Sequence, residues 1–533
     1  MIIRFSRRAL PAAVAAALLA GCTGSGGTDT ASTASATAPS PATTPTPTAT
    51  PTPTPTPTGA ADPALKAFYG QQLNWAPCAD DPATKKVDES AVQCATLKVP
   101  LDYAHPAGDA IDVALSRIPS ARPDQRVGSL LVNPGGPGGS GVRMVQTGQT
   151  DYDGPLHDHF DVVGFDPRGV GRTSPVNCLD DKARDGWLTT DEPGDAHGKT
   201  LADACQAKYG KALPFLGTRD TVRDMDVLRG ALGDEKLNYL GLSYGTYLGS
   251  IYAEEFPDRT GRLVLDGATD RSVPLIQHNI DQQAGFERAF QEFAADCVKQ
   301  KGCPLGKDPD KAAQKLAGFL DGLKDHPLTA TNGRTVTANA AWTGVIDNLY
   351  GGEKARADLR AILTLAMEHD KGDYLLTLAD DYNKRDEQGH YGVSADAYTA
   401  IHCADAAMAP TDAELQAALA ELAAKAPLIS KHNPLSALFD PDCRTWPFRS
   451  AEKPHTVKAE GSAPILVVGS TGDPTTPYAW SEKLAAGFAH GVLLTREGDG
   501  HTAYGRSACI RTAVHTFLVD GTVPAAGTRC PTD

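Results

Sequence analysis

Gly241-Leu242-Ser243-Tyr244-Gly245 is the most informative pentapeptide of the chain. It follows 236–240, a short apolar run that predicts a buried strand, and it precedes 246–253, which predicts a helix. A Gly-x-Ser-x-Gly sequence in this context forms a sharp turn that holds the serine in a strained and exposed position. The N-terminus of the helix favours developing negative charge beside the hydroxyl. The alternative is a chance match in a glycine-rich chain, so other parts of the sequence have to support the motif.

A glycine-rich loop, Asn133–Gly141, is the second strong signal. It follows 128–133, a continuous apolar run typical of a central parallel strand. Glycines let backbone N–H groups approach a ligand with no side chain in the way. We expect the amide of Gly136, with Gly135 as second choice, to form an oxyanion hole together with the amide of Tyr244.

Several classes of ligand are disfavoured. The loop is a poor dinucleotide site, because Pro134 and Pro137 remove amide donors and no acidic residue follows in the usual way. The formal net charge of −15 argues against nucleic acid and against a polybasic membrane patch. No Cys-x-x-Cys or Cys/His cluster has the spacing of a zinc site. The sequence therefore predicts neither a metal nor a cofactor.

Two further polar residues follow predicted strands near the C-terminus. Asp473 comes after the apolar run 464–469, and His501 lies in the loop after the strand 491–496. Alone, each has an ordinary alternative: Asp473 as a turn or N-cap residue before the helix 478–487, and His501 as a surface residue. Together with Ser243 they occur in the order Ser, Asp, His, each at a strand end, which predicts a catalytic triad.

A charged turn, Asp166–Ser174, follows the buried strand 160–165. Asp166 and Arg168 are candidates for catalysis or substrate binding. We favour a structural role, in which the turn supports the active-site loops, because buried ion pairs often serve architecture.

The pattern changes between 271 and 450, where helical periods replace strands, for example at 284–299, 311–324 and 359–370. This stretch is too long for a loop and predicts a separate helical cap. The domain prediction is a hydrolase core made of 63–270 and 451–533, with the cap (271–450) inserted between its two parts.

The N-terminus resembles an export signal. Basic residues precede an apolar segment that is too short to span a membrane permanently, so 1–21 is predicted to be a signal peptide. It ends in Leu19-Ala20-Gly21-Cys22, which is similar to the lipobox of bacterial lipoproteins and makes Cys22 the expected lipidation site. The Thr/Pro-rich remainder of 22–62 predicts an extended, solvated linker. We expect a protein held on the outer face of the cell membrane only by this lipid; an ordinary cleaved signal is the alternative.

The chain contains 11 cysteines, which is unusual outside an oxidising compartment. Setting Cys22 aside leaves an even number, consistent with disulfides throughout. Connectivity cannot be read from a sequence, and nearest-neighbour pairing is the simplest expectation.

Five motifs together resemble one branch of the α/β-hydrolases, the bacterial tripeptidyl aminopeptidases related to proline iminopeptidases. They are Asn133–Gly138, Asp166–Gly171, Gly241–Thr246, Gly472–Pro477 and Gly500-His501. The resemblance covers nearly the whole chain after the linker, and includes Ala400–Asp405 and Cys443–Pro447 of the cap. It implies an α/β-hydrolase fold: a mostly parallel central sheet, helices on both faces, and a large cap inserted after the strand that follows the serine turn.

The resemblance also implies a function. A serine exopeptidase would remove short peptides, tripeptides in this branch, from free N-termini through an acyl-enzyme and without a cofactor. Two alternatives stay open: a cell-envelope carboxylesterase or lipase with the same triad, and a surface-tethered binding lipoprotein that has lost catalysis. The intact Ser243, Asp473 and His501 count against the second.

An aminopeptidase must also recognise the α-ammonium of its peptide substrate. Proline iminopeptidases use acidic cap residues for this purpose, and Asp405 is our candidate by that resemblance, since it lies beside Cys403. A carboxylate–ammonium pair is strongest in a desolvated cleft. The ordinary alternative is a solvated surface aspartate.

Overall fold

The computed structural model describes residues 62–78, 91–148, 152, 154–188, 195–270, 272–392, 396–406, 411–432, 441–450 and 452–533. The predicted signal peptide, Cys22 and all but the last residue of the predicted linker lie outside these ranges. Within the described ranges, no helix combines the length and the apolar character needed to cross a membrane.

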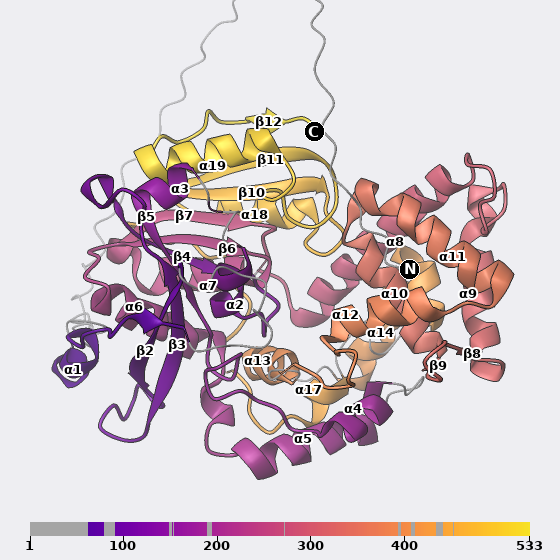
Figure 1. Ribbon diagram of the computed structural model, residues 1–533, viewed down its shortest axis with the longest axis horizontal. Helices are drawn as coiled ribbons and strands as arrows, with labels where there is room; N and C mark the ends of the chain where they lie inside the picture. The colour runs from indigo at the N-terminus through magenta and orange to yellow at the C-terminus, as the bar shows by residue number, and fades with distance from the viewer. Residues whose placement is uncertain are drawn as a thin grey trace, which may run out of the picture. The chain divides into compact units, whose positions relative to one another are not determined.

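The main sheet, as far as the chain is described, has ten strands in the order β1-β2-β3-β5-β4-β6-β7-β10-β11-β12 (Figure 1). The strands are β1 (Ala76–Pro77), β2 (Gln93–Pro100), β3 (Ala110–Ile118), β4 (Gly128–Asn133), β5 (Phe160–Phe165), β6 (Leu237–Leu242), β7 (Thr260–Asp266), β10 (Ile465–Gly472), β11 (Gly491–Asp499) and β12 (Arg529–Cys530). The pairings of β3 with β2 and β5 are antiparallel, and every pairing from β5 to β12 is parallel. The predicted α/β-hydrolase fold is confirmed.

Helices cover both faces of this sheet, because its central strands are apolar on both sides. One face packs against α6 (Thr218–Ala231), α7 (Tyr244–Glu255) and α18 (Tyr478–Gly487), and the other against α2 (Gly141–Thr147), α3 (Pro155–His159) and α19 (Ala508–Asp520). Side chains alternate between the two layers along each strand. In β7, Leu263 and Leu265 pack in the layer of α6, α7 and α18, whereas Val264 packs in the layer of α2, α3 and α19.

The parallel register brings the carboxyl ends of five strands to one edge of the sheet. Asn133 pairs with Gly241, Leu242 with Asp266, and Gly472 with Asp499. The loops that follow β4, β6, β7, β10 and β11 therefore lie beside one another, which is where α/β sheets bind ligands. These loops carry the glycine-rich segment, Ser243, Asp473 and His501.

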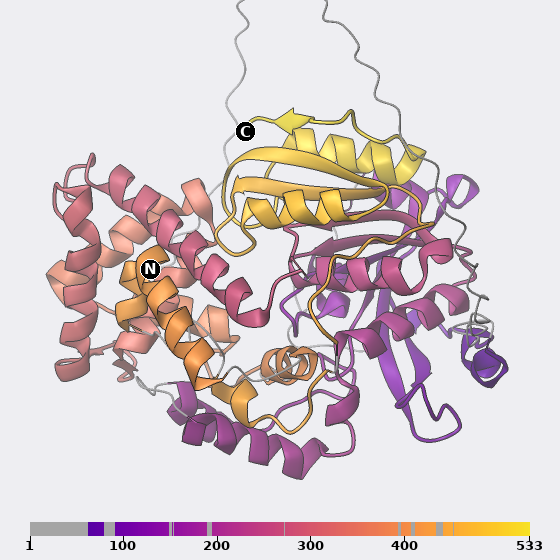
Figure 2. The same ribbon diagram turned by 180° about the vertical axis from the view of Figure 1, so that it is seen from behind.

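The cap has its own hydrophobic core, built from residues between Ile280 and Ile429 (Figures 1 and 2). Its helices are α8 (Leu275–Cys297), α9 (Pro309–Asp325), α10 (Ala338–Leu349), α11 (Arg356–His369), α12 (Asp373–Asn383), α13 (Ala397–Asp405), α14 (Asp412–Lys425), α15 (Pro427–His432) and α17 (Pro441–Thr445). A short hairpin, β8 (Leu328–Thr329) and β9 (Thr335–Val336), interrupts the helical pattern.

Two helices outside the predicted cap contact it. α4 (Asp181–Leu188) and α5 (Asp195–Tyr209) lie between β5 and α6 in sequence, and α5 packs against α17. Asp185 of α4 binds Arg385 Nε at 2.9 Å and the Tyr391 hydroxyl at 2.8 Å. The sequence analysis did not find these helices because α4 has only eight residues and α5 has little apolar periodicity.

The ten cysteines after the linker form five disulfides in the structure. The pairs are Cys78–Cys94, Cys178–Cys205, Cys297–Cys303, Cys403–Cys443 and Cys509–Cys530. Each joins nearest neighbours in the sequence, as expected. The fourth pair fixes the C-terminal end of α13 to α17.

Candidate active site

Ser243 occupies the turn between β6 and α7, at the N-cap position of the helix. Its backbone has φ 57° and ψ −122°, in the region that L-residues rarely adopt. The turn is held by the Ser243 amide, which donates to the carbonyl of Asp266 at 2.9 Å, and by the Thr246 amide, which donates to the carbonyl of Ser243 at 2.8 Å. This is the strained strand–turn–helix geometry that the pentapeptide predicts.

The glycine-rich loop lies directly against this turn. A Cβ added at Gly135, where φ is +89°, would approach both Ser243 Cβ and the Tyr244 amide nitrogen to 2.9 Å. The Gly135 amide donates to Asn133 Oδ1 at 2.9 Å. Since that amide has a partner, Gly136 is the better candidate to join Tyr244 in an oxyanion hole.

Asp166 and Arg168 serve architecture, as we favoured. Asp166 is fully buried and accepts from Ser140 Oγ at 2.5 Å, so it holds the end of the glycine-rich loop. The Arg168 guanidinium is also buried and donates to both oxygens of Asp224, at 2.6 and 2.8 Å. It donates further to the carbonyls of Pro100, Leu101 and Phe215. Both side chains are buried, and the Arg168 guanidinium makes five hydrogen bonds within the protein.

Asp473 and His501 form a hydrogen-bonded pair at the adjoining strand ends. His501 Nδ1 lies 3.0 Å from Oδ1 and 2.9 Å from Oδ2 of Asp473. The carboxylate also accepts from the amides of Thr475, Thr476 and Thr502, at 2.9, 2.9 and 3.0 Å, and from Thr476 Oγ1 at 2.9 Å. With an Nδ1–H directed to Asp473, His501 keeps Nε2 unprotonated, as a general base requires.

The electrostatics keep Asp473 ionised. Complete burial favours its neutral form, but the charge and hydrogen bond of His501, with the amides of Thr476 and Thr502, outweigh burial and hold the pKa of Asp473 below 3.8. Asp473 therefore stays negative through the neutral range, as the acid of a catalytic triad requires.

Asp266 is a buried residue whose role the sequence analysis missed. Its carboxylate accepts from the amide of Ala503, at 2.9 Å, and from that of Tyr504, at 2.8 Å. Its carbonyl binds the Ser243 amide, and a Cβ on the next residue, Gly267, would lie 3.3 Å from His501 Cε1. Asp266 therefore ties the serine turn to the loop of His501. Its position at the end of an apolar strand was the available signal.

We expect Asp266 to make stability depend on pH. Burial raises the pKa of Asp266 from 3.8 to about 6, although its amide partners favour the charge. The folded protein thus holds this proton more tightly than the unfolded chain, so the stabilisation is present below 3.8 and is lost as pH rises through 6. Asp266→Asn should remove about 2 kcal/mol of this loss between pH 4.5 and 7.5, measured by urea denaturation. Parallel pH profiles for the two proteins would contradict the assignment.

The cap completes the surroundings of His501. The His501 amide donates to the carbonyl of Tyr350 at 3.1 Å, and the Tyr350 ring stands nearly perpendicular to the imidazole, 5.6 Å away. Arg506 joins the two segments by donating to the carbonyls of His501, Tyr350 and Gly351, at 2.9, 3.0 and 2.9 Å. None of these cap contacts was foreseen, because they join segments about 150 residues apart.

The cap also contacts the other half of the site. A Cβ on Gly138 would lie 3.3 Å from the Tyr398 amide nitrogen, so α13 rests on the glycine-rich loop. Asp405, at the other end of α13, accepts from the Thr218 amide at 2.8 Å and from Thr218 Oγ1 at 2.6 Å. Thr218 Oγ1 in turn lies 2.5 Å from the Tyr244 hydroxyl. Asp405 is thus linked to the Tyr244 hydroxyl through the side chain of Thr218, and it binds the N-terminus of α6.

Two groups of potential metal ligands occur within the described ranges: Cys178, Cys205 and Asp396, and Glu254, Glu452 and His455. Both cysteines of the first group are consumed by their disulfide. In the second, Arg219 pairs with both glutamates, at 3.7 and 2.8 Å. Since protein partners occupy these atoms, we assign a metal to neither group.

Several known proteins are similar in sequence to this chain over most of its length. The chain is 37% identical to "Serine protease Hip1" of Mycobacterium tuberculosis over 494 residues, covering 88% of this chain and 92% of that protein. It is 37% identical to "Carboxylesterase B" of the same species over 472 residues (86% and 90% covered). It is 31% identical to "Tripeptidyl aminopeptidase" of Streptomyces lividans over 502 residues (89% of both chains).

A family model described as "TAP-like protein" matches residues 432–530, the part that carries Asp473 and His501. The relatives extend the similarity over the glycine-rich loop, the serine turn and the cap. With the fold and the geometry of the site, they establish that the chain belongs to the tripeptidyl aminopeptidase-like family of α/β-hydrolase serine enzymes.

Proposed function

We propose that this enzyme is a serine exopeptidase that removes short peptides, with tripeptides as the first expectation, from free N-termini. The observation that carries the proposal is the hydrogen-bonded pair of Asp473 and His501 beside a strained Ser243, within a chain related to two peptidases.

The proposed chemical steps are those of a serine hydrolase with this triad. His501 Nε2 takes the proton of Ser243 Oγ as the oxygen attacks the scissile carbonyl carbon, and Asp473 stabilises the resulting imidazolium. The amides of Gly136 and Tyr244 hold the oxyanion of the tetrahedral intermediate. His501 then donates its proton to the departing amine, which leaves an acyl-enzyme. Water, activated by His501, hydrolyses the acyl-enzyme and restores Ser243.

The decisive test is an activity profile. Mono-, di- and tripeptidyl p-nitroanilides are compared with free and with acetylated N-termini, beside a small p-nitrophenyl ester. An exopeptidase should cleave a free tripeptidyl substrate far better than its acetylated form. Equal rates on both forms, or turnover of the ester alone, would reject the proposal.

Carboxylesterase activity is the second candidate, and the relationship to "Carboxylesterase B" favours it specifically. The triad and oxyanion hole serve either reaction, since both pass through an acyl-enzyme. High kcat/KM on simple esters with none on any peptide in the profile would assign the enzyme to this class.

Asp405 is the proposed partner of the substrate ammonium. It is half-buried and is linked through Thr218 to the hydroxyl of Tyr244, although both of its oxygens already accept from Thr218. Asp405→Asn should lower kcat/KM on a free tripeptidyl substrate by about 10- to 100-fold, by loss of one charged hydrogen bond, and spare the small ester.

The matched control is Asp373→Asn, which changes a half-buried cap carboxylate bound only to the amide and hydroxyl of Thr331 among described residues. It should leave both activities unchanged. Equal loss of peptide and ester turnover in Asp405→Asn would mean that Asp405 acts only through Thr218 and Tyr244.

We also propose that the enzyme is exported and held at the cell surface by a lipid on Cys22. The support is the sequence Leu19-Ala20-Gly21-Cys22, followed by a Thr/Pro-rich linker. Cys22→Ser should release the protein to the medium or block its processing, as seen by fractionation. A mature N-terminus that is unmodified and begins downstream of Cys22 would contradict the anchor.

A further inference from the structure

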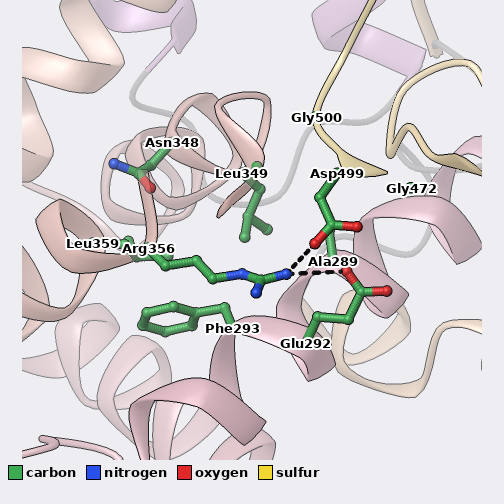
Figure 3. Close-up of a pocket in the computed structure, with 11 residues that line it drawn as sticks. Ala289, Glu292, Phe293, Asn348, Leu349, Arg356, Leu359, Gly472, Asp499 and Gly500 are labelled. Carbon is green, nitrogen blue, oxygen red and sulfur yellow. Dashed lines mark hydrogen bonds and ion pairs between the residues drawn. The ribbon is translucent and has the colours of Figure 1, made fainter. Parts of the chain in front are cut away.

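A small pocket lies where the cap meets the loop of His501 (Figure 3). Its core-side wall is Gly472, Asp499 and Gly500, and its cap-side wall comes from α8, α10 and α11. In Figure 3 the Arg356 guanidinium points toward two carboxylates, those of Asp499 and Glu292, with Phe293 beneath its aliphatic part. Three of the residues that line the pocket, Glu292, Arg356 and Asp499, form an ion cluster that joins the cap to the loop of His501.

The contacts of Arg356 link three elements. Arg356 Nη2, from α11, makes a hydrogen-bonded ion pair with Asp499 Oδ2 and lies 3.4 Å from Glu292 Oε2 of α8. The side chains of Arg356 and Asp499 are only 22% and 21% exposed, so solvent screens this pair less than a surface pair. Burial raises the pKa of Glu292, and the nearby charge of Asp499 adds to that shift although Arg288 opposes it. Two carboxylates thus share one guanidinium.

Asp499 is the last residue of β11 and stands two positions before His501. Besides Arg356, the cap supplies Glu353 Oε1, which accepts from the Asp499 amide at 3.3 Å. Its neighbour Gly352 is packed so closely that an added Cβ would lie 2.5 Å from the Asp499 carbonyl. Cap residues 350–356 therefore hold the segment of chain that leads from β11 to His501.

Helix α8 holds the loop of the triad acid in the same way. Arg288 donates to the Asp473 carbonyl at 3.1 Å, and Gln282 donates to the Thr475 carbonyl at 2.9 Å. A Cβ at Gly285 would lie 2.3 Å from the Pro474 carbonyl. Since α8 fixes the loop of Asp473 and α11 fixes the loop of His501, the connection between α8 and α11 bears on the geometry of the pair.

We propose that Arg356 is a positioning residue: by binding Asp499 and Glu292 together, it makes the cap set the placement of His501 relative to Asp473 and Ser243. The cap then takes part in turnover as well as in covering the substrate. Misplacing a catalytic group by about 1 Å can lower the reaction rate up to about 100-fold. By comparison, the loss of one ion pair has a small effect on the free energy of unfolding.

The proposal rests on serine hydrolysis and not on the peptide preference, so it is tested on the best reporter substrate, whether peptide or ester. Arg356→Ala should lower kcat about tenfold and change KM less than about twofold. It should slow labelling of Ser243 by a fluorophosphonate to the same degree. Arg356→Lys, which keeps the charge, should recover most of the loss.

Arg385→Ala is the matched control. Arg385 also joins the cap to another helix through a carboxylate, Asp185, but touches neither catalytic loop among the described contacts. It should cost similar thermal stability and leave kcat unchanged. If Arg356→Ala does not fold, Asp499→Asn gives the same test from the core side, since it keeps the shape of the side chain.

The outcomes are separable. A kcat in Arg356→Ala or Asp499→Asn within twofold of wild type would overturn the proposal, as would equal loss in Arg385→Ala. A raised KM with normal kcat would also overturn it, because Arg356 would then bind substrate. If no preference for free N-termini is found but Arg356→Ala lowers kcat as expected, only the exopeptidase proposal is rejected.

Discussion

Replacing Ser243 by Ala is expected to lower turnover by about 10⁴-fold or more, since triad members act as a unit and their loss leaves only the oxyanion hole and binding. Asp473→Asn and His501→Ala should approach the same floor. The fold should change little, because Ser243 is placed by its backbone contacts to Asp266 and Thr246. Turnover per folded molecule, corrected by circular dichroism, is the measurement.

Ser250→Ala is the control for this series. Ser250 lies in α7, the helix that Ser243 precedes as N-cap. It is fully buried and donates only to the carbonyl of Tyr247, at 2.9 Å, among described contacts. It should retain wild-type turnover. Near-normal activity of Ser243→Ala would contradict the assignment of the triad. A fluorophosphonate that fails to label Ser243 would revive the alternative of a binding protein that has kept the fold but lost catalysis.

Gly135→Ala should be the most damaging single change outside the triad. At φ +89° the added Cβ would lie 2.4 Å from the Leu242 carbonyl oxygen and 2.9 Å from the Tyr244 amide nitrogen. These are backbone atoms of the serine turn, so the loop has to move away and take Gly136 with it. Loss of one oxyanion donor costs about 10²- to 10³-fold in kcat, which we expect here with little change in KM.

Gly154→Ala separates this effect from simple backbone strain. Gly154 also has a positive φ, +79°, but no atom lies within 4 Å of the added Cβ. That substitution should cost about 1 kcal/mol of stability and leave kcat unchanged. A similar small loss of kcat in both variants would mean that the glycine-rich loop supplies no oxyanion donor.

Much of this enzyme could be predicted from local sequence, because local rules define the features concerned. The alternating and continuous apolar runs fixed the central strands, since a parallel sheet is buried on both faces. The Gly-x-Ser-x-Gly turn, the glycine-rich loop and the order of Ser243, Asp473 and His501 could be located because each stands at a strand end. Parallel strands then bring such ends to one edge.

The role of Asp266 required the tertiary structure, whereas chain order and motif already selected Asp473 as the triad acid. Both aspartates follow apolar strand residues. Only the folded chain shows that the Asp473 carboxylate binds His501 Nδ1, whereas that of Asp266 accepts backbone amides from the following loop. The difference arises from loop paths after β7 and β10, which no periodic pattern encodes.

The relation of the cap to the core was likewise decided only by tertiary structure. The sequence by itself determined that a helical insertion exists, because helical periodicity is local. It could not show that α4 and α5 contact that insertion, or that Tyr350, Arg356 and Arg288 hold the loops of His501 and Asp473. Such contacts join segments more than 100 residues apart, and they form only where packing brings the partners within hydrogen-bonding distance.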